Sequence, residues 1–172
     1  MNGIFLILPV LLIRYGLVAI LGGDTGSRVT FFPPSEGREK TAYWVYQLTT
    51  VALLIIPAFY QIHLKTILTN VGLLVYLFGL LFYAASVIQF AKPDKQGVNK
   101  NGLYSISRNP MYVAFFLYFL GCAFMLLSWP MFFVLLLHQY SVHFLILSEE
   151  RWCLKTFGED YQKYMVKVAR YL

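Results

Sequence analysis

Five long apolar stretches dominate the sequence and limit the folds that the chain can adopt. The only charged residue in all five is Arg14. Each stretch is long enough to cross a hydrocarbon core of about 30 Å, which needs roughly 17–25 helical residues. Only Ser128-Trp129-Pro130 separates the last two, which predicts a tight hairpin. The five stretches are Gly3–Leu21, Ala42–Ile62, Ile67–Phe90, Met111–Leu127 and Met131–Leu147.

Composition agrees with a membrane protein. Of the 172 residues, 59% are hydrophobic and only 13% are charged, whereas about a quarter of a soluble domain is charged. Barrel strands alternate in polarity and would not give such uninterrupted apolar runs. We therefore predict an all-α integral membrane protein with five transmembrane helices, forming one domain over residues 1–172. The basic tail after Ser148 predicts a short interfacial helical segment broken at Gly158.

The distribution of Lys and Arg predicts the orientation of the chain. The segments 22–41 and 91–110 and the tail hold twelve basic residues, and with five spans all three lie on one side. The opposite side has only Lys65. Because basic loops stay in the cytoplasm, we expect the N-terminus outside and the C-terminus inside. The membrane would be the plasma (inner) membrane of a prokaryote or the endoplasmic reticulum of a eukaryote. No nucleic-acid-binding stripe accompanies the net charge of +6, so we expect no nucleic-acid partner.

The start of the fourth apolar stretch is a candidate anion site. Asn109 followed by Pro110 is typical of a helix start, because Asn can cap free amides and Pro suits the first helical position. Arg108 stands just before this pair. A helix N-terminus beside an Arg can hold a carboxylate or phosphate. Ordinary helix capping plus a basic anchor at the inner surface is the alternative.

A second polar cluster lies on the fifth stretch and just beyond it. The spacing of Gln139, His143 and Glu150 places them on one helical face, and His138 and Glu149 share the neighbouring face. Adjacent carboxylates at the end of a span can attract a cation or accept hydroxyl hydrogen bonds. Alternatively, the glutamates form ion pairs with Arg151, Lys155 or Arg108. We take Gln139 and His143 as candidate substrate contacts, and His143 and Glu150 as candidate catalytic proton acceptors.

Arg14 is a third signal, because a charged side chain within a span is costly. Its head could reach the inner surface, or it could contact the anionic part of a substrate. The following segment, 22–41, contains Gly22-Gly23 and Pro33-Pro34, and could fold over a site as a lid or serve as an exposed connector.

These clusters predict a pocket in the C-terminal half, 91–172, that suits S-adenosylmethionine. Arg108 and backbone amides would bind its carboxylate, and Glu149 or Glu150 would bind its ammonium and ribose hydroxyls. Aromatic faces tolerate its sulfonium. A metal site is not predicted, because the histidines and carboxylates lack a recognisable ligand spacing.

In this region the sequence resembles the membrane methyltransferases that include isoprenylcysteine carboxyl methyltransferase and phosphatidylethanolamine N-methyltransferase. The resemblance implies that Gly102, Tyr104, Arg108, Asn109, Tyr112, Glu149 and Glu150 line a pocket for S-adenosylmethionine. It also implies that a lipophilic acceptor enters sideways from the bilayer. Leu145 stands where the prenylcysteine branch has an Arg, which weakens the case for a carboxylate acceptor. The matching residues are Gly102, Tyr104, Arg108, Asn109, Pro110, Tyr112, Glu149, Glu150, Phe157, Gly158, Tyr161, Tyr164 and Arg170.

The sequence therefore predicts a methyltransferase that acts on a membrane lipid or another amphiphilic molecule. An amine or thiol acceptor is favoured over a prenylcysteine carboxylate, and an amine would first have to lose a proton. Two alternative functions remain open. One is a sterol- or ene-type membrane reductase that uses NADPH, and the other is a small non-enzymatic membrane scaffold.

Overall fold

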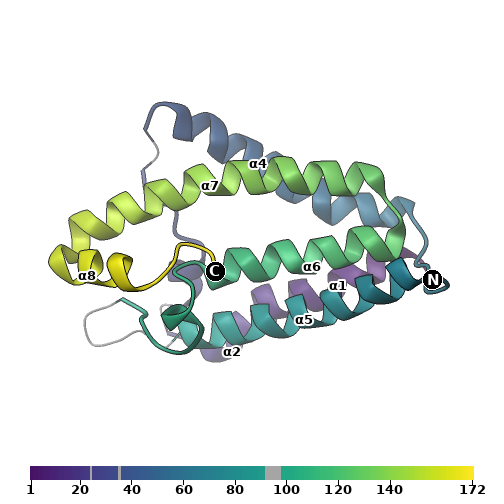
Figure 1. The fold of residues 1–172 in the computed structure, drawn as a ribbon, viewed down its shortest axis with the longest axis horizontal. Coiled ribbons are helices and arrows are strands. Elements are labelled where there is room, and N and C mark those ends of the chain that lie inside the picture. The colour runs from purple at the N-terminus through teal and green to yellow at the C-terminus, as the bar shows by residue number, and fades with distance from the viewer. Residues whose placement is uncertain (24, 35, 92–97) are drawn as a thin grey trace.

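The computed structural model describes residues 1–23, 25–34, 36–91 and 98–172. Figure 1 shows long helices that run side by side, with the N-terminus at one end of the bundle. In the described residues, four helices are long and apolar enough to cross a membrane, and α6 (Pro110–Leu126) is a shorter apolar helix of 17 residues. The predicted all-α membrane architecture is confirmed. The shorter elements are η1 (Gly3–Leu6), α1 (Ile7–Leu11), η2 (Leu12–Leu17), α2 (Val18–Leu21), α3 (Thr25–Val29), η3 (Ile56–Phe59) and η4 (Gly102–Ser105).

The first span consists of η1, α1, η2 and α2 in continuous succession. The η2 part, Leu12–Leu17, is a π-helix that contains Arg14. A π-helical turn inserts an extra residue into a helix and is frequent at functional sites. The π-helical turn was not predicted from the sequence, because an α-helix and a π-helix made of apolar residues have the same uninterrupted hydropathy.

The other helices keep the predicted order but differ in their ends. Helix α4 (Arg38–Ile55) begins earlier than predicted and ends before η3, because Pro57 cannot continue an α-helix. Helix α7 (Trp129–Phe157) continues ten residues beyond the predicted span end at Leu147. The apolar run ends there, but nothing breaks the helix until Gly158, whose φ is +54°. The predicted break in the tail is therefore confirmed, and α8 (Glu159–Lys167) follows it.

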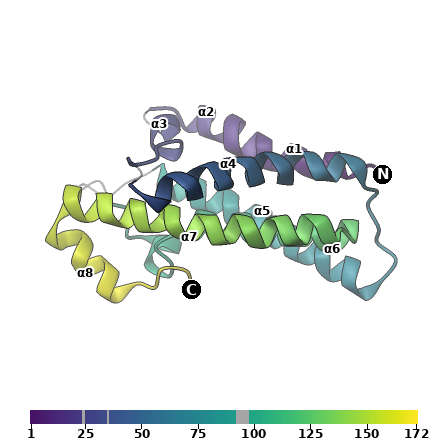
Figure 2. The ribbon, with the colours of Figure 1, turned by 90° about the horizontal axis from the view of Figure 1, so that it is seen from above.

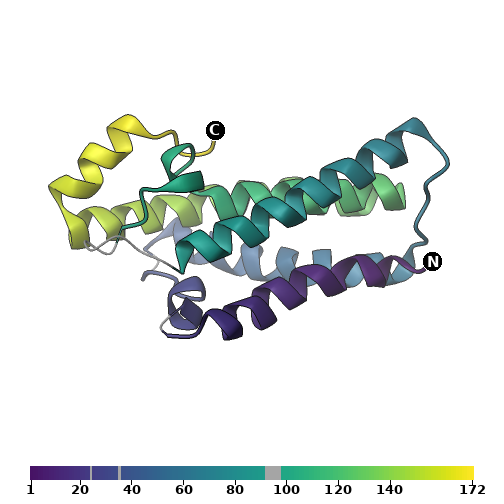
Figure 3. The same cartoon turned by 90° about the horizontal axis from the view of Figure 1, so that it is seen from below.

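Two helix pairs form most of the bundle: α5 (Ile67–Phe90) packs along α6, and α4 packs along α7. Figures 2 and 3 show the first span beside these pairs. Glycines allow α5 and α6 to approach closely. A Cβ added to Gly121 would lie 2.6 Å from the Cα of Tyr76, and one added to Gly79 would lie 2.8 Å from the Cα of Tyr118. Small residues at such crossings are how membrane helices gain packing energy.

Backbone polar groups of the first span tie it to this pair. The hydroxyls of Tyr76 in α5 and Tyr118 in α6 both donate to the backbone oxygen of Leu6. The predicted hairpin between α6 and α7 is also observed, with Leu127 in the left-handed region and Ser128 accepting from the Met131 amide at 3.3 Å. These contacts fix the helices relative to one another.

Five segments meet at the end of the bundle that we call the basic end: α3, the start of α4, the end of α5, the start of α6, and the end of α7 with α8 (Figures 1 and 2). The C-terminus returns to lie beside the start of α6 (Figure 1). The polar residues singled out by the sequence gather at this end.

Candidate functional site

The segment before α6 is held against α5 by Gly102. Its φ is +61°, and a Cβ there would lie 2.7 Å from Cδ of Gln89. The Gln89 side-chain oxygen accepts a hydrogen bond from the Leu103 amide at 2.6 Å. Gly102 was predicted as a cofactor contact, which stays a prediction; in the structure its positive φ favours glycine, and an added Cβ would displace the end of the Gln89 side chain.

The C-terminal segment wraps across the start of α6. The Arg108 amide donates to the Ala169 oxygen at 2.9 Å, and the Asn109 side chain donates to the Arg170 oxygen at 3.0 Å. The predicted helix start is confirmed, because Asn109 is the N-cap residue of α6 and Pro110 is its first residue. The Asn109 side chain, however, makes no capping hydrogen bond and binds the tail instead. The start of α6 is therefore fixed by residues some 60 positions later in the chain.

Tyr161 and Tyr164 of α8 anchor the tail to the segment before α6. The Tyr164 hydroxyl in α8 donates to the Tyr104 backbone oxygen at 2.6 Å. Burial raises the pKa of Tyr164 to about 12, so the hydroxyl keeps its proton and remains a donor. Tyr161 and Tyr164 also pack with Val98 in a small apolar cluster. This cluster holds α8 against the segment before α6.

Glu150 is enclosed by two arginines. Arg108 donates to its Oε1 from Nη2 at 2.7 Å and from Nε at 3.1 Å, and Arg170 Nη2 donates to its Oε2 at 2.8 Å. The Arg108 and Glu150 side chains are only 8% and 6% exposed. The hydrogen bond from Arg170 to Glu150 also raises the pKa of Arg170. A buried charge needs such partners, because an unpaired one is strongly destabilising.

The network leaves Arg108 little capacity for an external anion. Its Nη1 donates to the backbone oxygens of Met165 and Val168 at 2.7 and 2.9 Å. The ion pair with Glu150, one of the two roles expected for Arg108, is the one that is observed. Both carboxylate oxygens of Glu150 already accept hydrogen bonds from arginines, so the geometry does not favour the predicted catalytic role of Glu150.

Glu149 has very different surroundings from its neighbour. Its Oε1 accepts a hydrogen bond from the Tyr112 hydroxyl at 2.6 Å. No Lys, Arg or His in the described part of the chain forms an ion pair with it. The hydroxyls of Tyr46, Tyr104 and Tyr112 lie within electrostatic range of its carboxylate. Glu149 is thus a partly buried carboxyl group beside tyrosines, with no ion-pair partner in the described residues.

Further polar atoms in the same region have no partner. Tyr83 Oη, Tyr104 Oη and Arg28 Nη1 are buried without a hydrogen bond in the structure. Native proteins rarely leave such atoms unsatisfied unless a ligand, water or ion completes them. These atoms come from α5, η4 and α3, and together with Glu149 they mark a polar interior at the basic end.

Three of the residues in this interior were missed by the sequence reasoning: Arg28, Tyr46 and Tyr83. Tyr46 and Tyr83 lie in apolar helices where any face could point inward, and Arg28 lies in a segment with no motif. A polar residue inside an apolar span was the available signal, and it was used for Arg14 and for the polar residues of the fifth stretch but not for these tyrosines. The Arg14 guanidinium lies within electrostatic range of the Tyr83 and Tyr46 hydroxyls.

The two predicted faces of α7 are observed. His143 Nδ1 is 2.9 Å from the Tyr171 hydroxyl, so His143 faces the C-terminal segment together with Glu150. His138 Nδ1 is 3.0 Å from the Thr49 hydroxyl and its ring stacks on Tyr46, so His138 faces α4 on the same side as Glu149. Gln139 is half-buried and makes no side-chain hydrogen bond within the described residues.

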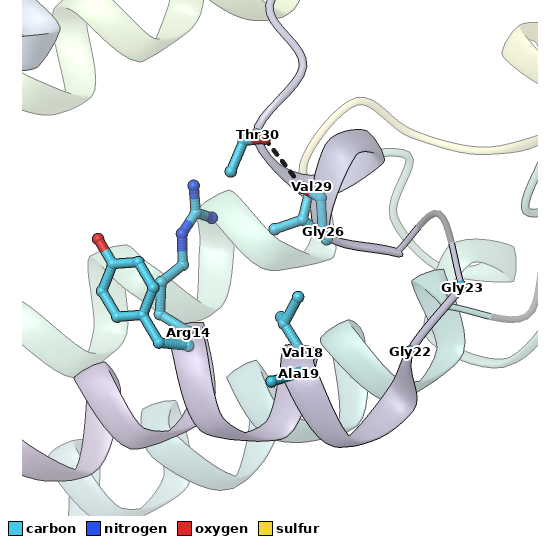
Figure 4. Close-up of a pocket in the computed structure, with 9 residues that line it drawn as sticks. Arg14, Val18, Ala19, Gly22, Gly23, Gly26, Val29 and Thr30 are labelled. Carbon is cyan, nitrogen blue, oxygen red and sulfur yellow. Dashed lines mark hydrogen bonds between the residues drawn. The ribbon is translucent and has the colours of Figure 1, made fainter.

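Arg14 lines an open groove of about 480 Å³ between the first span and α3. Figure 4 shows its guanidinium extending from the helix toward Thr30, with Val18 and Val29 beside it. The predicted substrate contact of Arg14 therefore lies in a groove that the Arg108–Glu150 pair does not line. Residues 25–34 also cover the basic end, because Phe32 packs on Tyr46 and Phe31 packs on Trp152.

The comparison with protein-family models gives one match. The family described as phospholipid methyltransferase matches residues 64–160, which are 97 of the 172 residues. The chain belongs to this family. None of the curated proteins matches the chain. The match includes α5, α6 and α7, and with them Tyr83, Tyr104, Tyr112 and Glu149.

Membership of the phospholipid methyltransferase family agrees with the long apolar helices. The protein is a multi-pass membrane protein of a methyltransferase family. Arg14, Arg28 and Tyr46 lie before the matched region, and Arg170 and Tyr171 lie after it. Residues near both ends of the chain therefore add polar groups to the candidate site. Its central residues lie in the region that the family model matches.

Proposed function

We propose that the protein is an S-adenosylmethionine-dependent methyltransferase that acts on the amine of a membrane phospholipid. The observation that carries the proposal is the contrast between the two adjacent glutamates. Glu150 is neutralised by Arg108 and Arg170, whereas Glu149 has no ion-pair partner among the described residues and lies beside tyrosines. A partly buried carboxylate of this kind suits a cationic ligand.

The donor's features match the groups that the site offers. Glu149 would hold the ammonium or the ribose hydroxyls, and the unpaired hydroxyl of Tyr104 could bind a further polar group. The aromatic rings of Tyr46 and Tyr112 would face the sulfonium, since aromatic faces attract cations. Arg108, Glu150 and Arg170 would act as positioning residues that fix the start of α6 against α7.

S-adenosylmethionine supplies a methyl group on a sulfonium, which an acceptor nucleophile displaces in line. The protein's tasks are then to align the acceptor and to exclude water. Phe32 and Tyr46 cover the interior from α4 and the segment before it. Movement of that segment as a lid stays a prediction.

An amine acceptor fits best for two reasons. The family description names phospholipids, and the buried position of Leu145 offers no cation for an acceptor carboxylate. An amine must first lose its proton. Of the two predicted proton acceptors, His143 fits better than Glu150, because among the described residues its Nδ1 contacts the Tyr171 hydroxyl and no cation, whereas both Glu150 oxygens accept from arginines. That role stays a prediction.

Calorimetric titration of the protein purified in detergent tests the proposal against its rivals. S-adenosylmethionine should bind, and reduced dinucleotide should not. Binding of NADPH alone would favour the reductase. If neither ligand binds to protein that is folded by its unfolding profile, the non-enzymatic scaffold becomes the better explanation.

A further inference from the structure

Arg28 has a buried hydrogen-bond donor that finds no acceptor in the described part of the chain. The residue lies in α3, the short helix at the basic end. Its Nη1 is buried and makes no hydrogen bond, and no carboxylate among the described residues forms an ion pair with it. Because such a donor is costly to leave unsatisfied, we expect a ligand or water to complete it.

The ring of Phe90, the last residue of α5, holds the Arg28 guanidinium in place. Cζ of Arg28 lies over this ring, 4.7 Å from its centroid. The contact uses the face of the guanidinium, whereas its N–H donors point outward in the plane of the group. Phe90 therefore positions Arg28 and leaves the edge of its guanidinium available to an anion.

Tyr104 contacts the same ring and also has an unsatisfied polar atom. The centroids of Phe90 and Tyr104 are 6.1 Å apart. Tyr104 is 5% exposed, and its hydroxyl is buried without a hydrogen bond. Burial raises the pKa of Tyr104, so the hydroxyl keeps its proton and can donate. Two side chains with unsatisfied donors, one cationic and one neutral, thus contact a single phenylalanine.

The arginine that was predicted to bind the donor's carboxylate uses its own donors within the chain. Arg108 donates to two backbone oxygens and to Glu150. Arg170 also pairs with Glu150, and Arg151 forms a separate ion pair. Among the side chains that the structure describes, Arg28 is the cation with a buried nitrogen that lacks a hydrogen bond.

We propose that Arg28 binds the carboxylate of S-adenosylmethionine through Nη1, with the Tyr104 hydroxyl as a second donor. A hydrogen bond from a guanidinium to a carboxylate is strong because both groups are charged. This inference rests on the proposed methyltransferase function. It assigns the donor's carboxylate to a residue that lies before the matched region, 64–160. With Glu149 on the ammonium, the zwitterionic end of the donor would meet one cation and one anion.

The position of Arg28 couples donor binding to the segment that covers the basic end. Phe31 packs on Trp152 with 5.0 Å between ring centroids, and Phe32 packs on Tyr46 at 5.7 Å. A carboxylate bound by Arg28 would add a third contact to this segment. Bound donor should therefore slow amide hydrogen exchange in residues 25–32, because opening the segment would break the added contact.

Two ligands that differ only in the carboxylate test the proposal without turnover. Calorimetric titration of the full chain in detergent compares S-adenosylmethionine with decarboxylated S-adenosylmethionine, which keeps the sulfonium, the adenosine and the ammonium. The parent should bind S-adenosylmethionine at least about tenfold more tightly, the difference expected for one charge-assisted hydrogen bond. Equal affinities would show that the carboxylate is not recognised and would overturn the proposal.

A variant assigns the preference to Arg28. Arg28→Gln should bind S-adenosylmethionine at least about tenfold more weakly than the parent and bind the decarboxylated compound no more weakly. Lys155→Gln removes an exposed charge from the same end of the bundle and should keep the parent's preference. If Arg28→Gln binds both compounds more weakly by the same factor, or keeps the full preference, Arg28 does not hold the carboxylate.

Hydrogen exchange in the parent keeps the proposal testable if Arg28→Gln does not fold. At saturation, S-adenosylmethionine should slow exchange in residues 25–32 more than the decarboxylated compound does, and equal protection would overturn the proposal. The failure of the proposed function is distinguishable, because a folded parent would then bind neither compound. A parent that binds S-adenosylmethionine and transfers its methyl group without any preference for the carboxylate would contradict only the role of Arg28.

Discussion

Arg108 at the start of α6 and Glu150 near the end of α7 form a buried ion pair, with 2.7 Å between Nη2 and Oε1. The residues are 42 positions apart, and the α6–α7 hairpin brings them together. Because Arg170 pairs with the other oxygen of Glu150, the same carboxylate also holds the C-terminal segment. This network holds α6, α7 and the C-terminal segment in fixed relative positions, and the neighbouring Glu149 faces the interior.

The two glutamates should respond oppositely to neutralisation. Glu150→Gln should lower the stability of the protein by about 3 kcal/mol, because it leaves Arg108 buried without its counter-charge. Glu149→Gln should leave the unfolding temperature unchanged or raise it, since no cation depends on it. Thermal unfolding in detergent, without ligand, measures both. A destabilised Glu149→Gln variant would contradict our description of Glu149.

The two arginines around Glu150 should differ in importance. The Arg108 side chain is 8% exposed and also binds two backbone oxygens, whereas the Arg170 side chain is 31% exposed. We therefore expect Arg108→Ala to destabilise the protein more than Arg170→Ala, by at least about 1 kcal/mol. Parallel unfolding curves give the comparison, and equal losses would show that burial does not govern this network.

The contact between α5 and α6 depends on glycine. A methyl group at Gly121 would meet the backbone of Tyr76, which cannot move aside as a side chain can. Gly121→Ala should therefore lower stability by about 1–3 kcal/mol, the usual cost of overpacking. Gly16→Ala is the matched control, because nothing lies within 4 Å of its added Cβ. Similar unfolding temperatures for the two variants would contradict the close approach.

The ion pair between Arg151 and Glu39 should hold in place the residues before α4 that cover the basic end. Arg151 Nη2 donates to Glu39 Oε2 at 2.8 Å, and Phe31 packs on Trp152 nearby. In Arg151→Gln, amide hydrogen exchange in residues 29–32 should be faster than in the parent, because a tether to α7 is lost. Lys155→Gln, one turn later on α7, should leave that exchange unchanged. Equal exchange in all three proteins would show that the pair does not restrain the segment.

Much of the fold could be predicted from hydropathy alone, and the site only in part. The apolar runs predicted five helices and the α6–α7 hairpin, and the ordered motif placed Arg108 near the glutamate pair. The faces of the helices could not be predicted, because lipid and protein interior are both apolar and select no side of a membrane helix. Tyr46 and Tyr83 were missed for this reason. The separate environments of Glu149 and Glu150 depend on the return of the C-terminal segment, which no local pattern encodes.

The most direct test of the account is transfer of a radiolabelled methyl group from S-adenosylmethionine to phosphatidylethanolamine by the purified protein, compared with Glu149→Gln. We predict labelled phospholipid with the parent and at least a tenfold lower rate at subsaturating donor with the variant, because the donor loses the carboxylate that binds it. A folded parent that leaves the phospholipid unlabelled, or a Glu149→Gln variant that labels it at the parent's rate, would contradict the account.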